Sequence, residues 1–512
     1  METPTDKKNG LDWIAFSVSG GLLVLFIIAS LFNDKLVGQW INDSFSFAVK
    51  YFGAYWELLL LATFVIGLVL ACTRYGRVRL GNMDKPENGN YRWIAMIMCT
   101  LLASGGVFWA AAGPMYHYLT TPPLFSGVEK GSMGAAFPAM AQSFLHWGFL
   151  AWAILGTLTT IVLMYAHYHK GYPLKPRTLL YPIFGSSIYK KSFIGSLADI
   201  VSIVSVAAGT IGPIGFLGLQ VGYGLHAIFG IPDTFVTQSL VIILLAVIAS
   251  ISAATGVDRG IQWLSRMNVG LAVILMVAML ILGPTLFIID LFLGSGGFYI
   301  ENFLSMSLYR VDQSWLGSWT IFFWGWFIGY GPMMAIFISR ISRGRTIREL
   351  IIAVSIIAAI VSNFWFTVVG GSGIFYEMQN PGSVSSALQE NGMPAAVNAI
   401  MSQIPLGIAL SIGFLLCTII FVATTADSMS YTVAVTLSGK DEPNRFYRVF
   451  WALMFGFVAV SLLAIGEGSI GALQNFIVVT AVPVSLLLLP SLWDAPKIAM
   501  KMAKEQNIVE KK

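Results

Sequence analysis

Long apolar runs of about twenty residues alternate with short polar segments along nearly the whole chain. A helix that crosses a bilayer needs about 20 mostly apolar residues, so each run predicts one crossing. The twelve expected crossings are 12–32, 55–73, 93–112, 143–166, 196–228, 234–255, 267–290, 318–338, 350–374, 405–438, 446–465 and 471–494. Two of them, 196–228 and 405–438, exceed one straight crossing and are expected to tilt, break or extend into water.

The composition supports a membrane protein with many crossings. Of the 512 residues, 56% are hydrophobic and 11% are charged, whereas soluble proteins carry about 25% charged residues. So few polar side chains cannot cover a water-facing surface, which excludes a soluble enzyme, a nucleic-acid-binding protein and a disordered scaffold. The three cysteines, Cys72, Cys99 and Cys417, lie in or beside apolar runs, which argues against a disulfide framework. The polar N-terminal residues lead directly into the long apolar run 12–32, so we expect no cleavable signal peptide.

The basic residues predict the orientation, because Lys and Arg are enriched in cytoplasmic loops. If both termini are cytoplasmic, four of the 30 Lys and Arg residues lie outside: Lys35, Lys50, Lys130 and Arg310. An odd number of crossings would spoil this separation. We therefore expect both termini inside, in a bacterial inner membrane. The expected segments are a tail (1–11), two peripheral crossings (12–73), a first repeat (93–290), a periplasmic surface helix (291–317), a second repeat (318–494) and a short cytoplasmic tail (495–512).

Two crossings carry Gly and Pro near their middle. They are LLASGGVFWAAAGP (Leu101 to Pro114) and FFWGWFIGYGP (Phe322 to Pro332). Corresponding helices of inverted repeats are often interrupted in transporters, and the freed backbone groups bind ions and substrate. The spacing matches two five-helix inverted repeats preceded by two extra helices. Ordinary packing of small residues between helices is the alternative.

The eighth crossing is rich in aromatic residues. Trp near a membrane end is usually an interface anchor, and this interpretation suits Trp315 and Trp319, whereas Trp324 and Trp326 fall in mid-crossing. Aromatic faces at depth suit a permanently cationic ligand, because a quaternary ammonium has no N–H for a carboxylate and is recognised by cation–π contact. The fourth crossing adds Trp147 within a His-Trp-Gly sequence.

Hydroxyl groups surround an acid in the tenth crossing. Asp427 lies in ATTADSMSYT, directly after Thr424 and Thr425. Charged residues inside the membrane are functional candidates, and hydroxyl and carbonyl oxygens are the hard ligands that small hard cations favour. Hydrogen bonding between helices by Thr and Ser is the alternative.

These motifs resemble the betaine/choline/carnitine transporter family. The segment Trp319 to Leu350 is similar to the family's aromatic eighth helix and the arginine-rich loop after it, and the His-Trp-Gly and Thr-Thr-Ala-Asp-Ser sequences also match. The resemblance covers essentially the whole transmembrane region. It implies an all-α membrane protein with the leucine-transporter-like fold, assembled as a homotrimer, that moves a small zwitterionic or cationic onium substrate such as glycine betaine, choline, carnitine or dimethylsulfoniopropionate.

The resemblance also implies the site residues. The substrate-binding positions that it implies are Trp147, Trp326, Phe327, Tyr330, Tyr116 and Trp324. For sodium it implies the backbone carbonyls of Cys99, Leu102 and Phe421 and the hydroxyls of Thr424 and Thr425, with Asp427 a structural acceptor beside them. Many members have Trp where this chain has Phe327, and Gly113-Pro114 stands where an acid before Pro or Ile is common, which leaves the substrate open.

The expected activity is sodium symport of a betaine-type osmolyte, with Na⁺ as the coupling ion and no cofactor. The alternative is a sodium-independent antiporter of the carnitine/butyrobetaine kind. Such exchangers interrupt the hydroxyl pair and carry Arg at the position of Asn268, and this chain does neither. Arg266 lies about 200° around the helix from Asn268 and should point elsewhere. A membrane enzyme or electron carrier would need facing His or Cys pairs, which the sequence lacks.

Overall fold

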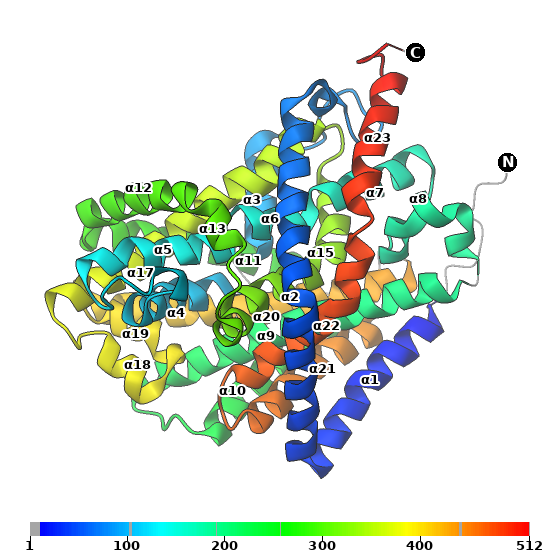
Figure 1. Ribbon diagram of the computed structural model, residues 1–512. Helices are drawn as coiled ribbons and strands as arrows, with labels where there is room; N and C mark the ends of the chain where they lie inside the picture. The colour runs from blue at the N-terminus through cyan, green and yellow to red at the C-terminus, as the bar shows by residue number, and fades with distance from the viewer. Residues whose placement is uncertain (1–10, 102–104, 191, 256–257, 440–442, 511–512) are drawn as a thin grey trace.

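The computed structural model describes residues 11–101, 105–190, 192–255, 258–439 and 443–510. Regular structure in these ranges is helical, apart from one isolated bridge between Arg79 and Thr346. The helices of the first half are α1 (Trp13–Phe32), α2 (Asp34–Cys72), α3 (Asn90–Leu101), α4 (Val107–Thr120), α5 (Met133–Trp147), α6 (Phe149–Gly156), α7 (Leu158–Met164), α8 (Tyr181–Phe184), α9 (Phe193–Phe229), α10 (Phe235–Thr255) and α11 (Asp258–Leu282). Those of the second half are α12 (Thr285–Glu301), α13 (Phe303–Ser307), α14 (Gln313–Leu316), α15 (Phe322–Ile341), α16 (Ile347–Ile351), α17 (Ala358–Gln379), α18 (Ser385–Asn391), α19 (Ala396–Met401), α20 (Gly407–Ser438), α21 (Arg445–Ile465), α22 (Gly471–Leu488) and α23 (Ser491–Glu505) (Figure 1).

Eleven helical stretches among the described residues are long and apolar enough to cross a membrane. They match the expected crossings except the third, of which the structure describes α3 and α4 on either side of residues 102–104, each shorter than a crossing requires. Residues 102–104 lie outside the described ranges, and Gly105 and Gly106 directly precede α4. The chain is therefore an all-helical membrane protein, and a twelfth crossing made from two half-helices stays a prediction.

Proline sets two boundaries that differ from the expected ones. Helix α11 ends at Leu282, before Gly283-Pro284, and the next helix, α12, begins at Thr285 rather than near 291. Proline disfavours a helical residue before it and lacks an N–H of its own. A second break precedes α23, at Pro490, and α23 runs from Ser491 to Glu505, past the expected end of the last crossing at 494. Helix α12 runs across the direction of α2 (Figure 1).

Burial separates a central group of helices from a peripheral one. In the stretches containing α5–α7 and α15, 94% of the most apolar window is buried, against 28% in α1 and α10. Helix α15 packs on α6, α7, α9 and α22, and α17 packs on α4 and α5. The Gly- and Trp-rich helices therefore form the interior of the protein.

The arginine-rich segment after α15 fastens three segments together. Arg345 donates to the Asn88 carbonyl and to Asn90 Oδ1, both at 2.6 Å, and its guanidinium lies 4.2 Å from the centre of the Trp93 ring. Arg348 donates to the Ala71 carbonyl at 2.7 Å, at the end of α2. The loop thus holds the start of α3 against the ends of α2 and α15.

Candidate functional site

Trp147 lies where the fourth crossing is interrupted. It ends α5, and α6 begins at Phe149 after the non-helical Gly148. A Cβ at Gly148 would lie 2.1 Å from the Phe144 carbonyl oxygen, so only glycine fits this break. The interruption places the Trp147 indole in the interior, where 1% of the residue is exposed.

Trp147, Trp326 and Phe327 form a compact three-ring cluster between α5 and α15. The Trp147 ring centre lies 5.8 Å from that of Trp326 and 5.3 Å from that of Phe327, with both pairs of planes at 84°. The Trp326 and Phe327 ring centres are 6.3 Å apart. Edge-to-face contacts place the positive edge of one ring on the negative face of another. Aromatic faces in this cluster therefore contact partial positive charge on neighbouring ring edges.

Trp326 is held in position by a carbonyl that proline leaves unpaired. In a helix the N–H of residue 213 would pair with the carbonyl of Gly209, but residue 213 is proline and has no N–H. The Trp326 Nε1–H donates to this carbonyl instead, at 3.0 Å. One turn further along α15, the hydroxyls of Tyr330 and Thr210 lie 3.2 Å apart. Helix α9 therefore fixes both aromatic residues of α15.

The third crossing reaches the same cluster. A Cβ at Gly105 would lie 2.4 Å from Cη2 of Trp326, so the backbone at Gly105 packs closely on the indole. The Gly106 carbonyl accepts a hydrogen bond from Nε1 of Trp365 on α17 at 3.0 Å. Segments from both expected repeats thus meet at the three-ring cluster.

The other expected substrate-binding residues occupy different places. Tyr330 is buried against Gly209, and no ring contact among the described residues joins it or Trp324 to the three-ring cluster. Tyr116 belongs to a second cluster, in which its ring centre lies 4.4 Å from that of Trp319. The structure therefore brings together three of the six expected residues directly, while Tyr330 adjoins them through α9.

The second cluster contains residues that sequence analysis missed. His117 lies 4.5 Å from Trp319, and Phe323 lies 4.8 Å from His146 and 5.8 Å from Trp147, between ring centres. The interface-anchor interpretation of Trp319 is wrong, because the residue is 3% exposed. The spacing of 319, 323 and 327, four residues apart on one face of a helix, was the signal that could have found this row of rings.

The expected sodium oxygens lie on one face of α20. Thr424 and Thr425 are each 6% exposed, and the Thr424 hydroxyl lies 2.8 Å from the Ile420 carbonyl oxygen and 3.3 Å from that of Phe421. Cys99 lies in the last turn of α3, and Leu102 lies outside the described residues. The oxygens on α20 suit a small hard cation, whereas the contribution of the third crossing stays a prediction.

Comparisons with known proteins agree with these features. The model of the betaine/carnitine/choline family transporters matches residues 14–504. The chain belongs to this family. It is 54% identical over 503 residues to "Glycine betaine transporter 2" of Vibrio parahaemolyticus, with 98% of this chain and 93% of the relative covered. It is 32% identical to "Glycine betaine transporter OpuD" of Bacillus subtilis (98% and 95% covered) and 30% identical to "Ectoine/hydroxyectoine transporter" of Virgibacillus pantothenticus (94% and 95% covered).

As a member of the betaine/carnitine/choline family, the protein is a membrane transporter and not an enzyme. The acid of α20 is paired: Asp427 Oδ1 lies 3.2 Å from Nη2 of Arg448 on α21, and both side chains are nearly buried. The carboxylate therefore joins α20 to α21 beside Thr424 and Thr425. This pairing matches a structural role for Asp427 better than direct ligation of an ion.

Proposed function

We propose that this transporter imports glycine betaine or a closely related onium zwitterion, with the onium group held by Trp147, Trp326 and Phe327. The observation that carries the proposal is the buried three-ring cluster with Trp326 anchored to Gly209. An onium group within about 6 Å of the ring centres gains cation–π attraction that is worth roughly 2 kcal/mol per desolvated contact. In the bound state, the onium group would take the place of the positive ring edges that face the neighbouring rings in the structure.

Tyr330, Tyr116 and Trp324 have secondary parts in this proposal. Tyr330 keeps α15 in register with α9 through Thr210. In this proposal Tyr116, whose ring centre lies 4.4 Å from that of Trp319, and the deeply buried Trp324 do not surround the onium group. The names of the relatives support betaine-type osmolytes, including ectoines, and choline, carnitine and dimethylsulfoniopropionate remain the competing substrates.

We further propose that sodium drives uptake, bound by Thr424, Thr425 and the carbonyls of Phe421, Cys99 and Leu102. Asn268 supports symport over the sodium-independent antiporter. Its side chain is fully buried and donates to the Cys417 carbonyl at 3.1 Å, whereas Arg266 is exposed. The guanidinium that the antiporter requires at position 268 is thus absent from the face of α11 that meets α20.

The proposed assembly is a homotrimer of twelve-crossing chains with the leucine-transporter-like fold, in a bacterial inner membrane with both termini cytoplasmic. The uneven distribution of Lys and Arg supports this orientation. The family membership supports the fold.

Uptake into proteoliposomes tests the proposed function. Labelled glycine betaine, ectoine, choline, carnitine and dimethylsulfoniopropionate are compared, each with an inward sodium gradient, with potassium replacing sodium, and with internal substrate. We expect sodium-dependent uptake of glycine betaine. Equal uptake in potassium, together with stimulation by internal substrate, would favour the antiporter.

A further inference from the structure

A zwitterionic substrate brings a carboxylate into the same interior as its onium group. In glycine betaine a single methylene separates the two, so the carboxylate must lie beside the three-ring cluster. Helices α5, α6, α15 and α17 pack around this cluster and contain one Lys or Arg residue, Arg340. Arg340 follows Trp326 on α15 at a distance of roughly 20 Å along the helix. Because a carboxylate that leaves water is costly unless hydrogen bonds replace its hydration, neutral donors must hold it.

The break at Gly148 leaves a backbone donor unpaired in the interior. Gly148 is buried, and its N–H makes no hydrogen bond with any described residue, whereas its carbonyl accepts from the Trp152 N–H at 3.1 Å. Buried backbone N–H groups without a partner are rare in proteins. Gly148 directly follows Trp147 in the chain, so this donor adjoins a ring of the cluster.

The side chain of Asn363 on α17 reaches the same break. Its Nδ2 lies 3.5 Å from the position that a Cβ of Gly148 would take. Asn363 is 5% exposed, and its Oδ1 is buried without a hydrogen-bond partner among the described residues. One turn further along α17, the ring centre of Phe366 lies 5.2 Å from that of Trp147. Helix α17 therefore carries an uncharged, unpaired amide to the edge of the cluster.

The two indole groups of the cluster differ in their hydrogen bonding. The Trp326 Nε1–H donates to the Gly209 carbonyl, whereas the Trp147 Nε1–H is buried and has no partner in the described part of the chain. Buried polar side-chain atoms are usually hydrogen-bonded. The residues that meet at this break therefore carry three unpaired polar groups, which are the N–H groups of Trp147 and Gly148 and the amide of Asn363.

We propose that the Gly148 N–H and the Asn363 amide donate to the carboxylate of the substrate and thereby select zwitterions over onium compounds without a carboxylate. The inference rests on the proposed function, because it assumes an onium group at the three-ring cluster. A carboxylate has two oxygens that only accept hydrogen bonds, so it satisfies both donors, with the Trp147 N–H as a third. Choline carries a hydroxyl instead, and hydrogen bonds without an ionised partner are weaker.

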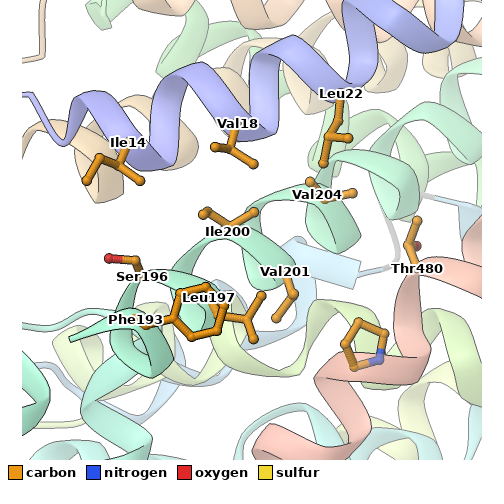
Figure 2. Close-up of a pocket in the computed structure, with 11 residues that line it drawn as sticks. Ile14, Val18, Leu22, Phe193, Ser196, Leu197, Ile200, Val201, Val204 and Thr480 are labelled. Carbon is orange, nitrogen blue, oxygen red and sulfur yellow. The ribbon is translucent and has the colours of Figure 1, made fainter.

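A groove elsewhere in the molecule does not offer such donors. It lies between α1, α9 and α22, and its walls are apolar apart from Ser196 and Thr480, which lie at opposite ends of it in Figure 2. The Thr480 hydroxyl already donates to the Ile477 carbonyl at 3.0 Å. Two separate hydroxyls, one of them engaged, do not make a carboxylate site.

Binding of glycine betaine and of choline to the purified protein, followed by tryptophan fluorescence, tests the carboxylate site. The two ligands share the trimethylammonium group, and only glycine betaine has a carboxylate. We expect the parent to prefer glycine betaine, and Asn363→Leu, which keeps the bulk without the amide, to reduce this preference at least tenfold. Asn363→Asp places a second carboxylate at the break and should reduce it further. Asn391→Asp is the matched control, because Asn391 is exposed on α18.

The ratio of the two affinities separates recognition from a structural role. If Asn363 only supported the fold, its replacement would weaken both ligands alike and leave the preference unchanged. Asn363→Gln keeps an amide and should retain more of the preference than Asn363→Leu. A parent-like preference in Asn363→Leu, or equal binding of both ligands by the parent, would overturn the carboxylate site and leave the onium site standing. A parent that binds no glycine betaine would overturn the proposed function itself.

Discussion

The indole N–H of Trp326 donates to the carbonyl of Gly209 at 3.0 Å, the carbonyl that Pro213 leaves without a helical partner. One proline in α9 thereby creates an acceptor in the protein interior, and one tryptophan in α15 satisfies it. The bond fixes the plane of the indole among the rings that pack on it. Substrate recognition and helix packing are linked through this single contact.

Replacing Trp326 separates these two roles. Trp326→Leu removes both the ring and the donor, and loss of one contact of ~2 kcal/mol should weaken substrate binding about thirtyfold. Trp326→Phe keeps a ring and removes the donor. We expect it to bind more tightly than the Leu variant but to unfold at lower temperature than the parent, because a buried unpaired carbonyl costs about 1–3 kcal/mol. Substrate-induced tryptophan fluorescence and thermal melts measure both effects, and parent-like affinity in Trp326→Leu would remove this residue from the site.

Gly209 tests the close approach of α9 to α15. A Cβ there would lie 2.4 Å from Cε2 of Tyr330 and 3.3 Å from Cδ1 of Trp326, so Gly209→Ala must displace both rings. We expect a loss of affinity of at least tenfold. Gly270→Ala is the matched control, because nothing lies within 4 Å of a Cβ at that position of α11. If the two variants bind alike in the same titration, the packing of α9 does not set the position of the rings.

Trp147 and Tyr116 should respond differently to loss of their rings. Trp147 contacts both Trp326 and Phe327, whereas Tyr116 contacts Trp319 and His117 in the second cluster. Trp147→Leu should weaken substrate binding about thirtyfold, by the same reasoning as for Trp326, and Tyr116→Leu by less than about threefold. Isothermal titration with each purified variant makes the comparison. A larger effect at Tyr116 would shift the onium site to the second cluster.

The hydroxyls on α20 test sodium coupling. Thr424→Ala and Thr425→Val each remove one expected oxygen ligand, so half-maximal uptake should need at least tenfold more sodium. Thr432→Val is the control on the same helix, because Thr432 is partly exposed and its hydroxyl donates to the Ser428 carbonyl. Uptake is measured against sodium concentration at constant ionic strength. Unchanged sodium dependence in both test variants would leave the antiporter as the better account.

Asp427 should affect stability more than sodium affinity. Its carboxylate pairs with Arg448 at 3.2 Å in a nearly buried position, and removal of one partner from a buried pair costs about 3–5 kcal/mol. Asp427→Asn keeps the shape and removes the charge, so we expect a lower melting temperature and a sodium requirement close to that of the parent. A many-fold change in the sodium requirement without a change in melting temperature would make the carboxylate an ion ligand.

The sequence by itself determined that the chain is an all-helical membrane transporter, and it placed most of the spanning helices. Twenty-residue apolar runs have few alternatives in a bilayer, because every backbone polar group must be satisfied within the segment. The motifs around Trp326 and Asp427 were recognisable because acidic residues in mid-span are costly and clustered aromatic residues there are unusual. Helix ends were less predictable where Gly283-Pro284 and Pro490 divide apolar runs that look continuous.

Only the tertiary structure decided which aromatic residues lie together. Trp147 joins Trp326 and Phe327 because Gly148 interrupts its helix and α9 fixes the indole of Trp326. Tyr116 instead pairs with Trp319, outside the three-ring cluster. Sequence spacing gives the face of one helix on which a residue lies. The neighbours of that face depend on how separate helices pack, through contacts such as the one between Trp326 and Gly209 that join residues more than a hundred positions apart.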